Sequence, residues 1–153
     1  ALLIADEPTT ALDATIQAQI LDLLDEIRQQ TGMGIVFITH DLSVVARLCQ
    51  RVVVLYAGQV VEETDVHRLF ARPRHPYTRA LLAARPSTDT RPKTPLAEIR
   101  GQVPSLHDLP GGCTYADRCP LAQPRCRAQP PALRQVNGEQ HNVRCWRADE
   151  LEA

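Results

Sequence analysis

The chain has 153 residues, of which 44% are hydrophobic and 23% are charged, and its formal net charge is −1. This composition excludes collagen-like, mucin-like and wholly disordered proteins, and the length suits about one domain. The longest unbroken apolar run, residues 52–57, has six residues. A membrane-spanning helix needs about 20, so no such helix is predicted.

Charge, proline and cysteine are unevenly distributed. Residues 1–72 carry a net charge of −5 and residues 73–153 a net charge of +4. Eleven of the twelve prolines and four of the five cysteines lie in the second part. We therefore expect two domains, 1–72 and 73–153. The opening residues lack an initiator Met and are typical of a strand interior, so we expect the sequence to begin inside a domain.

The first part alternates between strand and helix patterns. Residues 2–5 form a short apolar run, typical of a strand buried on both faces. Asp13 then precedes a helical pattern with apolar residues on one face, which Gly32 ends. Residues 34–39 predict a second buried strand. Strand, helix and strand at this spacing indicate a βαβ unit with a parallel sheet, so the fold class is α/β.

A second helix and a hairpin are expected next. Residues 41–48 predict a short helix. Residues 52–56 and 59–63 predict two strands joined by a turn at residues 57–58.

Chemistry in parallel sheets gathers beyond the carboxyl ends of the strands. Asp6 and Glu7 follow the first predicted strand, and His40 follows the second. Spacing alone does not show whether these three residues are catalytic. Asp6 and Glu7 could equally lie in a solvated turn, and His40 could be an ordinary loop histidine.

The exact residues add a family resemblance. Leu-Leu-Ile-Ala-Asp-Glu-Pro-Thr-Thr-Ala-Leu-Asp at 2–13 resembles the Walker B segment and D-loop of ATP-binding cassette (ABC) ATPases. Ile-Thr-His-Asp-Leu at 38–42 resembles their histidine switch. The resemblance implies that Asp6 holds Mg²⁺ at the phosphates of ATP and that Glu7 is the general base for the attacking water. It also implies that His40 contacts the γ-phosphate and that Asp13 reaches a partner ATPase subunit.

Two parts of that catalytic site are missing from the sequence. A P-loop needs Gly-x-x-x-x-Gly-Lys-Ser/Thr, and the one lysine, Lys93, lies between Pro92 and Thr94. The signature motif of the family, with its Ser-Gly-Gly core, is also absent. We therefore expect this chain to be the C-terminal part of an ABC ATPase domain, from Walker B onward, and to be inactive alone.

The second part resembles one branch of that family. Residues 65–72 predict a short helix, and Pro76 suits the first turn of the next. His-Pro-Tyr-Thr-Arg-Ala-Leu-Leu at 75–82 resembles the ATPases of oligopeptide, dipeptide and nickel importers. A proline-rich stretch, residues 86–110, predicts an extended connector.

Four cysteines follow the connector: Cys113, Cys119, Cys126 and Cys145. They resemble the C-terminal extension of the same branch, whose members are thought to hold an iron–sulfur cluster. The resemblance thus implies a 4Fe-4S cluster, with Zn²⁺ as the main alternative because four cysteines also bind zinc. Two disulfides or unmetallated thiols remain open, and Cys49 is expected to stand apart as a small buried residue.

The resemblance implies an ATP-hydrolysing motor of a peptide-class importer on the cytoplasmic face of the plasma membrane. Its partners would be a second ATPase subunit, identical or paralogous, membrane permeases and, indirectly, an extracytoplasmic substrate-binding protein. Nucleic-acid binding is not expected, because the arginines of the tail lack interleaved aromatic residues. A non-transport ABC ATPase and a non-catalytic metal-binding or interaction module are the alternatives. The cargo stays open.

Overall fold

The computed structural model describes residues 1–85 and 98–151. The chain forms two compact units, Ala1–Gln50 and Arg51–Ala153, and each is described by itself. The boundary between these units precedes the compositional shift at residue 73, because strands from before that shift pair with strands from the tail. Twelve of the expected connector residues, 86–97, lie outside the described part, and residues 98–110 contain no helix or strand.

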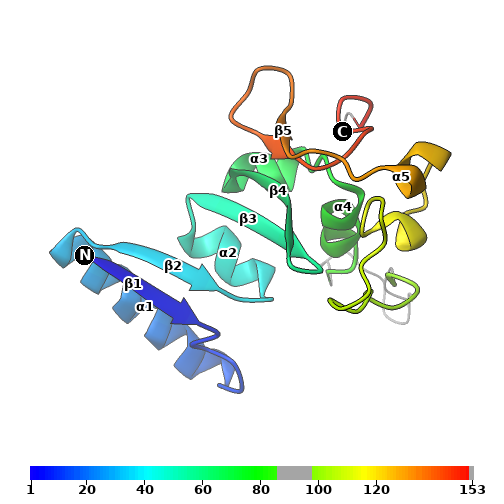
Figure 1. Cartoon of the computed structure of the whole chain (residues 1–153). Helices are drawn as coiled ribbons and strands as arrows, with labels where there is room; N and C mark the ends of the chain where they lie inside the picture. The colour runs from blue at the N-terminus through cyan, green and yellow to red at the C-terminus, as the bar shows by residue number, and fades with distance from the viewer. Residues whose placement is uncertain (86–97, 152–153) are drawn as a thin grey trace. The chain divides into compact units, whose positions relative to one another are not determined.

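The first unit contains the expected βαβ arrangement with one further helix. Strands β1 and β2 pair in parallel, with Leu2 opposite Gly34 and Asp6 opposite Ile38. Helix α1 lies along one face of this pair (Figure 1). The elements are β1 (Leu2–Asp6), α1 (Ala14–Thr31), β2 (Gly34–Ile38) and α2 (Leu42–Leu48).

Helix α1 begins and ends at the predicted residues. The carboxylate of Asp13 accepts hydrogen bonds from the backbone N–H groups of Thr15 and Ile16, which have no partner inside the helix. Gly32 ends the helix with a φ of 66°, a left-handed conformation that a residue without Cβ adopts at little cost.

The prediction that β1 is buried on both faces is wrong for this chain. Leu2 and Ile4 on one face are 65% and 64% exposed, whereas Ala5 on the other is buried. Burial of both faces of a strand requires a layer of structure on each side, and α1 supplies only one.

The second unit is built around a four-stranded antiparallel sheet with the order β3-β4-β6-β5. The predicted hairpin is confirmed: Ala57 and Gly58, both with positive φ, connect its strands. The strands are β3 (Arg51–Tyr56), β4 (Gln59–Asp65), β5 (Arg134–Gln135) and β6 (Asn142–Val143). The helices are α3 (Val66–Ala71), α4 (Pro76–Ala83), the 3₁₀ turn η1 (Ala116–Arg118) and α5 (Pro124–Ala128).

The tail is packed into this unit rather than appended to it. Strand β6 pairs with β4, with Glu62 opposite Val143. A small buried cluster of Val136, Val143 and Ala148 has Cys145 packed against it. The rings of three tyrosines from β3, α4 and the segment before η1 meet at centroid distances of 4.7–5.4 Å: Tyr56, Tyr77 and Tyr115.

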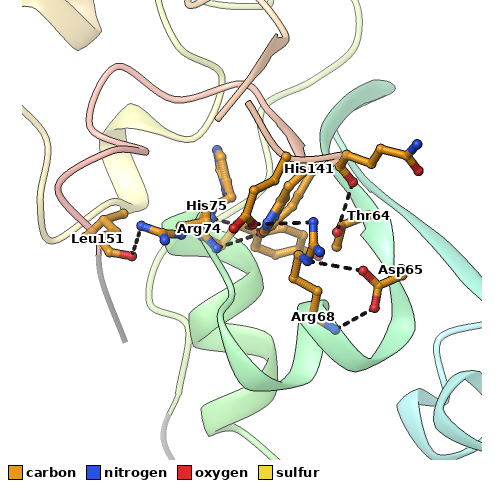
Figure 2. Close-up of polar contacts among 11 residues, drawn as sticks. Thr64, Asp65, Arg68, Arg74, His75, His141 and Leu151 are labelled. Atoms are coloured by element: carbon orange, nitrogen blue, oxygen red, sulfur yellow. Dashed lines mark hydrogen bonds and ion pairs between the residues drawn. The ribbon is translucent and has the colours of Figure 1, made fainter. Parts of the chain in front are cut away.

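A buried carboxylate, Glu62 of β4, connects three segments of the second unit. It is fully buried and accepts hydrogen bonds from the backbone N–H groups of Arg74 (2.7 Å) and His75 (3.0 Å). Its Oε1 also lies 2.7 Å from Nε2 of His141, which is 79 residues away along the chain. We call this set of contacts the Glu62 clamp, and Figure 2 shows its partners Arg74, His75 and His141.

Further contacts extend the Glu62 clamp to the end of the described chain. Nη1 of Arg74 donates to the carbonyl oxygen of Leu151 at 3.1 Å (Figure 2). Nδ1 of His75 accepts a hydrogen bond from the backbone N–H of Tyr77 and so caps α4. Burial lowers the pKa of His75 to about 4, so its ring is neutral near pH 7.

Candidate functional site

The parallel pairing of β1 and β2 brings two of the predicted catalytic residues together. Glu7 follows β1, and its backbone N–H donates to the carbonyl oxygen of Ile38 at 2.9 Å. His40 follows β2, and its Nδ1 lies 3.1 Å from Oε1 of Glu7. A carboxylate and an imidazole, 33 residues apart in sequence, are therefore in hydrogen-bonding contact at the carboxyl edge of the sheet.

Glu7 is held in an uncommon backbone conformation. Its φ is +43°, a region that residues other than glycine seldom adopt and that often occurs at functional sites. His40 and then Thr10, both hydrogen-bonded to the carboxylate, hold the pKa of Glu7 below its usual value. Glu7 is therefore ionised near pH 7, the form that a general base needs.

The segment after His40 is fixed by two polar contacts of Asp41, the first residue of the expected helix. Asp41 caps α2 through the backbone N–H of Ser43, at 2.8 Å. Its other carboxylate oxygen accepts from Nε2 of Gln17 on α1, at 3.1 Å. No local pattern marks Gln17, because its partner is 24 residues away.

The two other predicted residues lie close by in the chain. Asp6 is the last residue of β1 and lies at the same edge as Glu7. Asp13 caps α1, so its side chain has a partner within its own helix, at 3.0 Å from both Thr15 N and Ile16 N. The expected roles of Asp6 in holding Mg²⁺ and of Asp13 in reaching a partner subunit stay predictions.

A second feature, in the other unit, is a pocket lined by the four cysteines of the tail. Its cavity is about 20 Å³, and its lining also includes His75, Tyr115 and Arg147. The backbone N–H of Cys113 donates to the carbonyl oxygen of Cys126 at 2.7 Å. All four cysteines of the tail line this pocket: Cys113, Cys119, Cys126 and Cys145. The fifth, Cys49, ends α2 and is half-buried rather than buried.

Burial disfavours the thiolate form at three of the four pocket cysteines. Burial raises the pKa of Cys113 and Cys119, and it raises the pKa of Cys145 to about 11. All five cysteines are free, so the two-disulfide alternative is not formed here.

The pocket suits a metal centre by donor type but not by present geometry. Four thiols are the ligand set of many iron–sulfur and zinc sites. Across residues 1–85 and 98–151, however, no three His, Cys, Asp or Glu side chains are arranged to hold a metal ion. A cavity of about 20 Å³ has room for roughly one water molecule, so the lining would have to move outward around a cluster.

The tail arginines bind within the tail and the hairpin. Arg118 donates to the carbonyl oxygens of Ile99 and Arg100, both at 2.9 Å. Arg144 donates to that of Val60 at 2.7 Å. These two tail arginines therefore bind backbone carbonyl groups of their own unit.

The two parallel strands end in an acidic pair and in a histidine. These residues and the motifs around them place the chain in the class of ABC-type ATP-binding proteins. The model of a family described as "Oligopeptide/dipeptide transporter, C-terminal region" matches residues 61–126. Over nearly its whole length the chain is similar to peptide-transporter ATP-binding proteins of the ABC class.

Relatives of the chain carry matching names. It is 52% identical over 150 residues to a protein of Sinorhizobium fredii named a probable peptide ABC transporter ATP-binding protein, covering 98% of this chain and 44% of the relative. It is 56% identical over 132 residues to the dipeptide transport ATP-binding protein DppD of Escherichia coli, covering 86% of this chain and 40% of the relative. The chain thus spans less than half the length of these relatives. In the described part, no helix combines the length and apolarity needed to cross a bilayer.

Proposed function

We propose that the chain is part of the ATP-hydrolysing motor of a peptide-class ABC importer. The observation that carries this proposal is the contact between Glu7 and His40, 3.1 Å apart at the carboxyl edge of the parallel strands. The relatives named as peptide and dipeptide transport ATP-binding proteins support the cargo class. The P-loop and the signature motif, which the sequence lacks, would come from the rest of the motor.

Each residue of the edge has a proposed role in hydrolysis. Ionised Glu7 accepts a proton from the attacking water, and the His40 ring bridges Glu7 and the γ-phosphate. Asp6 holds Mg²⁺, which would neutralise charge on the phosphates of ATP. Asp13 reaches a second ATPase subunit. The complete protein would lie on the cytoplasmic face of the membrane, bound to permease subunits and served by an extracytoplasmic substrate-binding protein, with no nucleic-acid partner.

The test of this proposal is ATP turnover by the full-length protein in its transporter complex. Glu7→Gln keeps the shape of the side chain but removes the base, so we expect most turnover to be lost while ATP still binds. His40→Ala should lower turnover with a smaller effect on ATP affinity. The matched control is Glu26→Gln, an exposed carboxylate on α1. Near-normal hydrolysis by the Glu7→Gln protein would refute the proposal.

We further propose that the cysteine pocket holds a metal centre, a 4Fe-4S cluster or, failing that, Zn²⁺. Support comes from the four cysteines on one pocket and from Arg147, whose backbone N–H lies 3.4 Å from Sγ of Cys145. The metal would deprotonate the thiols, including the three whose pKa is raised by burial.

Anaerobic purification of the full-length protein distinguishes the metals. A brown protein with equal iron and sulfide would establish the cluster, and a colourless protein with one zinc per chain would establish zinc. Serine at any of the four pocket cysteines should remove the metal, whereas Cys49→Ser should not. A protein that binds neither metal would contradict the proposal.

A further inference from the structure

The carboxylate of Glu7 has a second hydrogen-bond partner besides His40. The hydroxyl of Thr10 donates to Oε2 of Glu7 at 2.9 Å, while Nδ1 of His40 contacts Oε1. Both oxygens of one carboxylate are therefore held, each from a different part of the chain. The family resemblance of residues 2–13 implied no role for Thr10.

The backbone of the following turn places Thr10 within reach. The backbone N–H of Thr10 donates to the carbonyl oxygen of Glu7 at 3.2 Å, and that of Leu12 donates to Thr9 at 3.3 Å. Thr9 is 8% exposed, so this turn is anchored by a buried side chain. The positive φ of Glu7 turns the chain sharply after β1, and the Thr10 side chain folds back over the carboxylate.

Two hydrogen bonds fix the orientation of the Glu7 carboxylate, whereas one would leave it free to rotate. The terminal torsion of a glutamate side chain has a broad energy profile, so a carboxylate held at one oxygen can still rotate. A carboxylate offers about four lone-pair directions, and His40 and Thr10 occupy two of them. The remaining directions then have a defined orientation, as a water molecule in line for attack requires.

We infer that Thr10 is a positioning residue that orients the carboxylate of Glu7 for hydrolysis. The inference rests on the proposed function of Glu7 as the base. Thr10 does not itself contact ATP or the attacking water in this account. Its contribution is to the fraction of time in which Glu7 faces the water.

The test compares Thr10→Val with Thr10→Ser in the full-length protein. Valine keeps the branched shape without the hydroxyl, and we expect kcat to fall roughly 10- to 100-fold with KM for ATP within about twofold of the original. Serine keeps the hydroxyl and should restore kcat to within about threefold. The urea midpoint of both variants should match that of the parent, which separates positioning from loss of the fold.

A double variant makes the test independent of folding differences. If Thr10 acts through Glu7, Thr10→Val should cause no further loss of residual turnover in a Glu7→Gln background. Full activity of Thr10→Val, or equal loss with serine and valine, would overturn the inference even if Glu7→Gln is inactive. An active Glu7→Gln protein would instead refute the proposed function.

Discussion

Glu62→Ala should strongly destabilise the second unit. The substitution leaves the backbone N–H groups of Arg74 and His75 without their acceptor, and both residues are buried, at 7% and 1% exposed. A buried donor that loses its partner costs about 1–3 kcal/mol. His141, also buried, loses its contact at 2.7 Å and becomes a third buried group without its partner.

These contacts share one carboxylate, so their costs overlap rather than add fully. Three lost partners at about 1–3 kcal/mol each, with overlap, predict a fall of about 3–5 kcal/mol in the free energy of unfolding. This is a large share of the roughly 5–15 kcal/mol that stabilises an ordinary domain. Urea unfolding measures the change. The one tryptophan, Trp146, lies in the tail and reports on the segment that the Glu62 clamp holds.

Glu63→Ala is the matched control, because Glu63 is the next residue on β4 and its side chain points the other way. Its carboxylate is 25% exposed, pairs with Arg51, itself 70% exposed, and accepts a hydrogen bond from Nδ2 of Asn142 at 3.2 Å. An exposed ion pair contributes about 0–1 kcal/mol and a hydrogen bond about 0.5–1.5 kcal/mol, so the expected loss is smaller than at Glu62. The reasoning about the Glu62 clamp would be refuted if Glu62→Ala lowered the stability no more than Glu63→Ala.

Two further predictions concern the same unit. Burial lowers the pKa of His75 to about 4, so below pH 6.5 the unfolded chain binds a proton that the folded chain does not. The contribution of His75 to stability is therefore complete above pH 6.5. The free energy of unfolding should fall by up to about 3 kcal/mol as the pH drops toward 4. Urea midpoints at pH 7 and 4.5 should show this loss to be smaller in His75→Asn. Gly112→Ala should destabilise the pocket, by roughly 1–3 kcal/mol, because its Cβ would collide with the carbonyl oxygens of Cys126 and Arg127, whereas the Cβ of Gly111→Ala meets nothing within 4 Å. Thermal unfolding of the two alanine variants checks this, and equal midpoints would count against it.

The first unit was largely predictable because its signals are local. Asp13 and Gly32 mark the ends of α1 in the sequence itself, and both act there as expected. The contact between Glu7 and His40 followed from the rule that parallel strands bring their carboxyl ends to one edge. Thr10 was missed because a hydroxyl three residues along a turn has no distinctive pattern.

The second unit was less predictable because its key contacts are distant in sequence. Strands β5 and β6 have two residues each, too few for any alternation to be visible. The Glu62 clamp joins residues 79 positions apart. Alternation along β4 gives no clue to Glu62, because the hairpin register shifts there and Val61 and Glu62 are both buried.

The sheet of the second unit has a consequence for how the protein is made. The partners of β4 in the tail follow it by about 80 residues, as the separation of 79 between Glu62 and His141 shows. At roughly 5–20 residues per second, a ribosome completes β4 about 4–16 s before the strand that covers it. During that interval the hairpin presents an open backbone edge, which other chains can pair with. Slow synthesis would prolong the exposure of this edge. In a chain that stops before β6, the edge of β4 would stay unpaired.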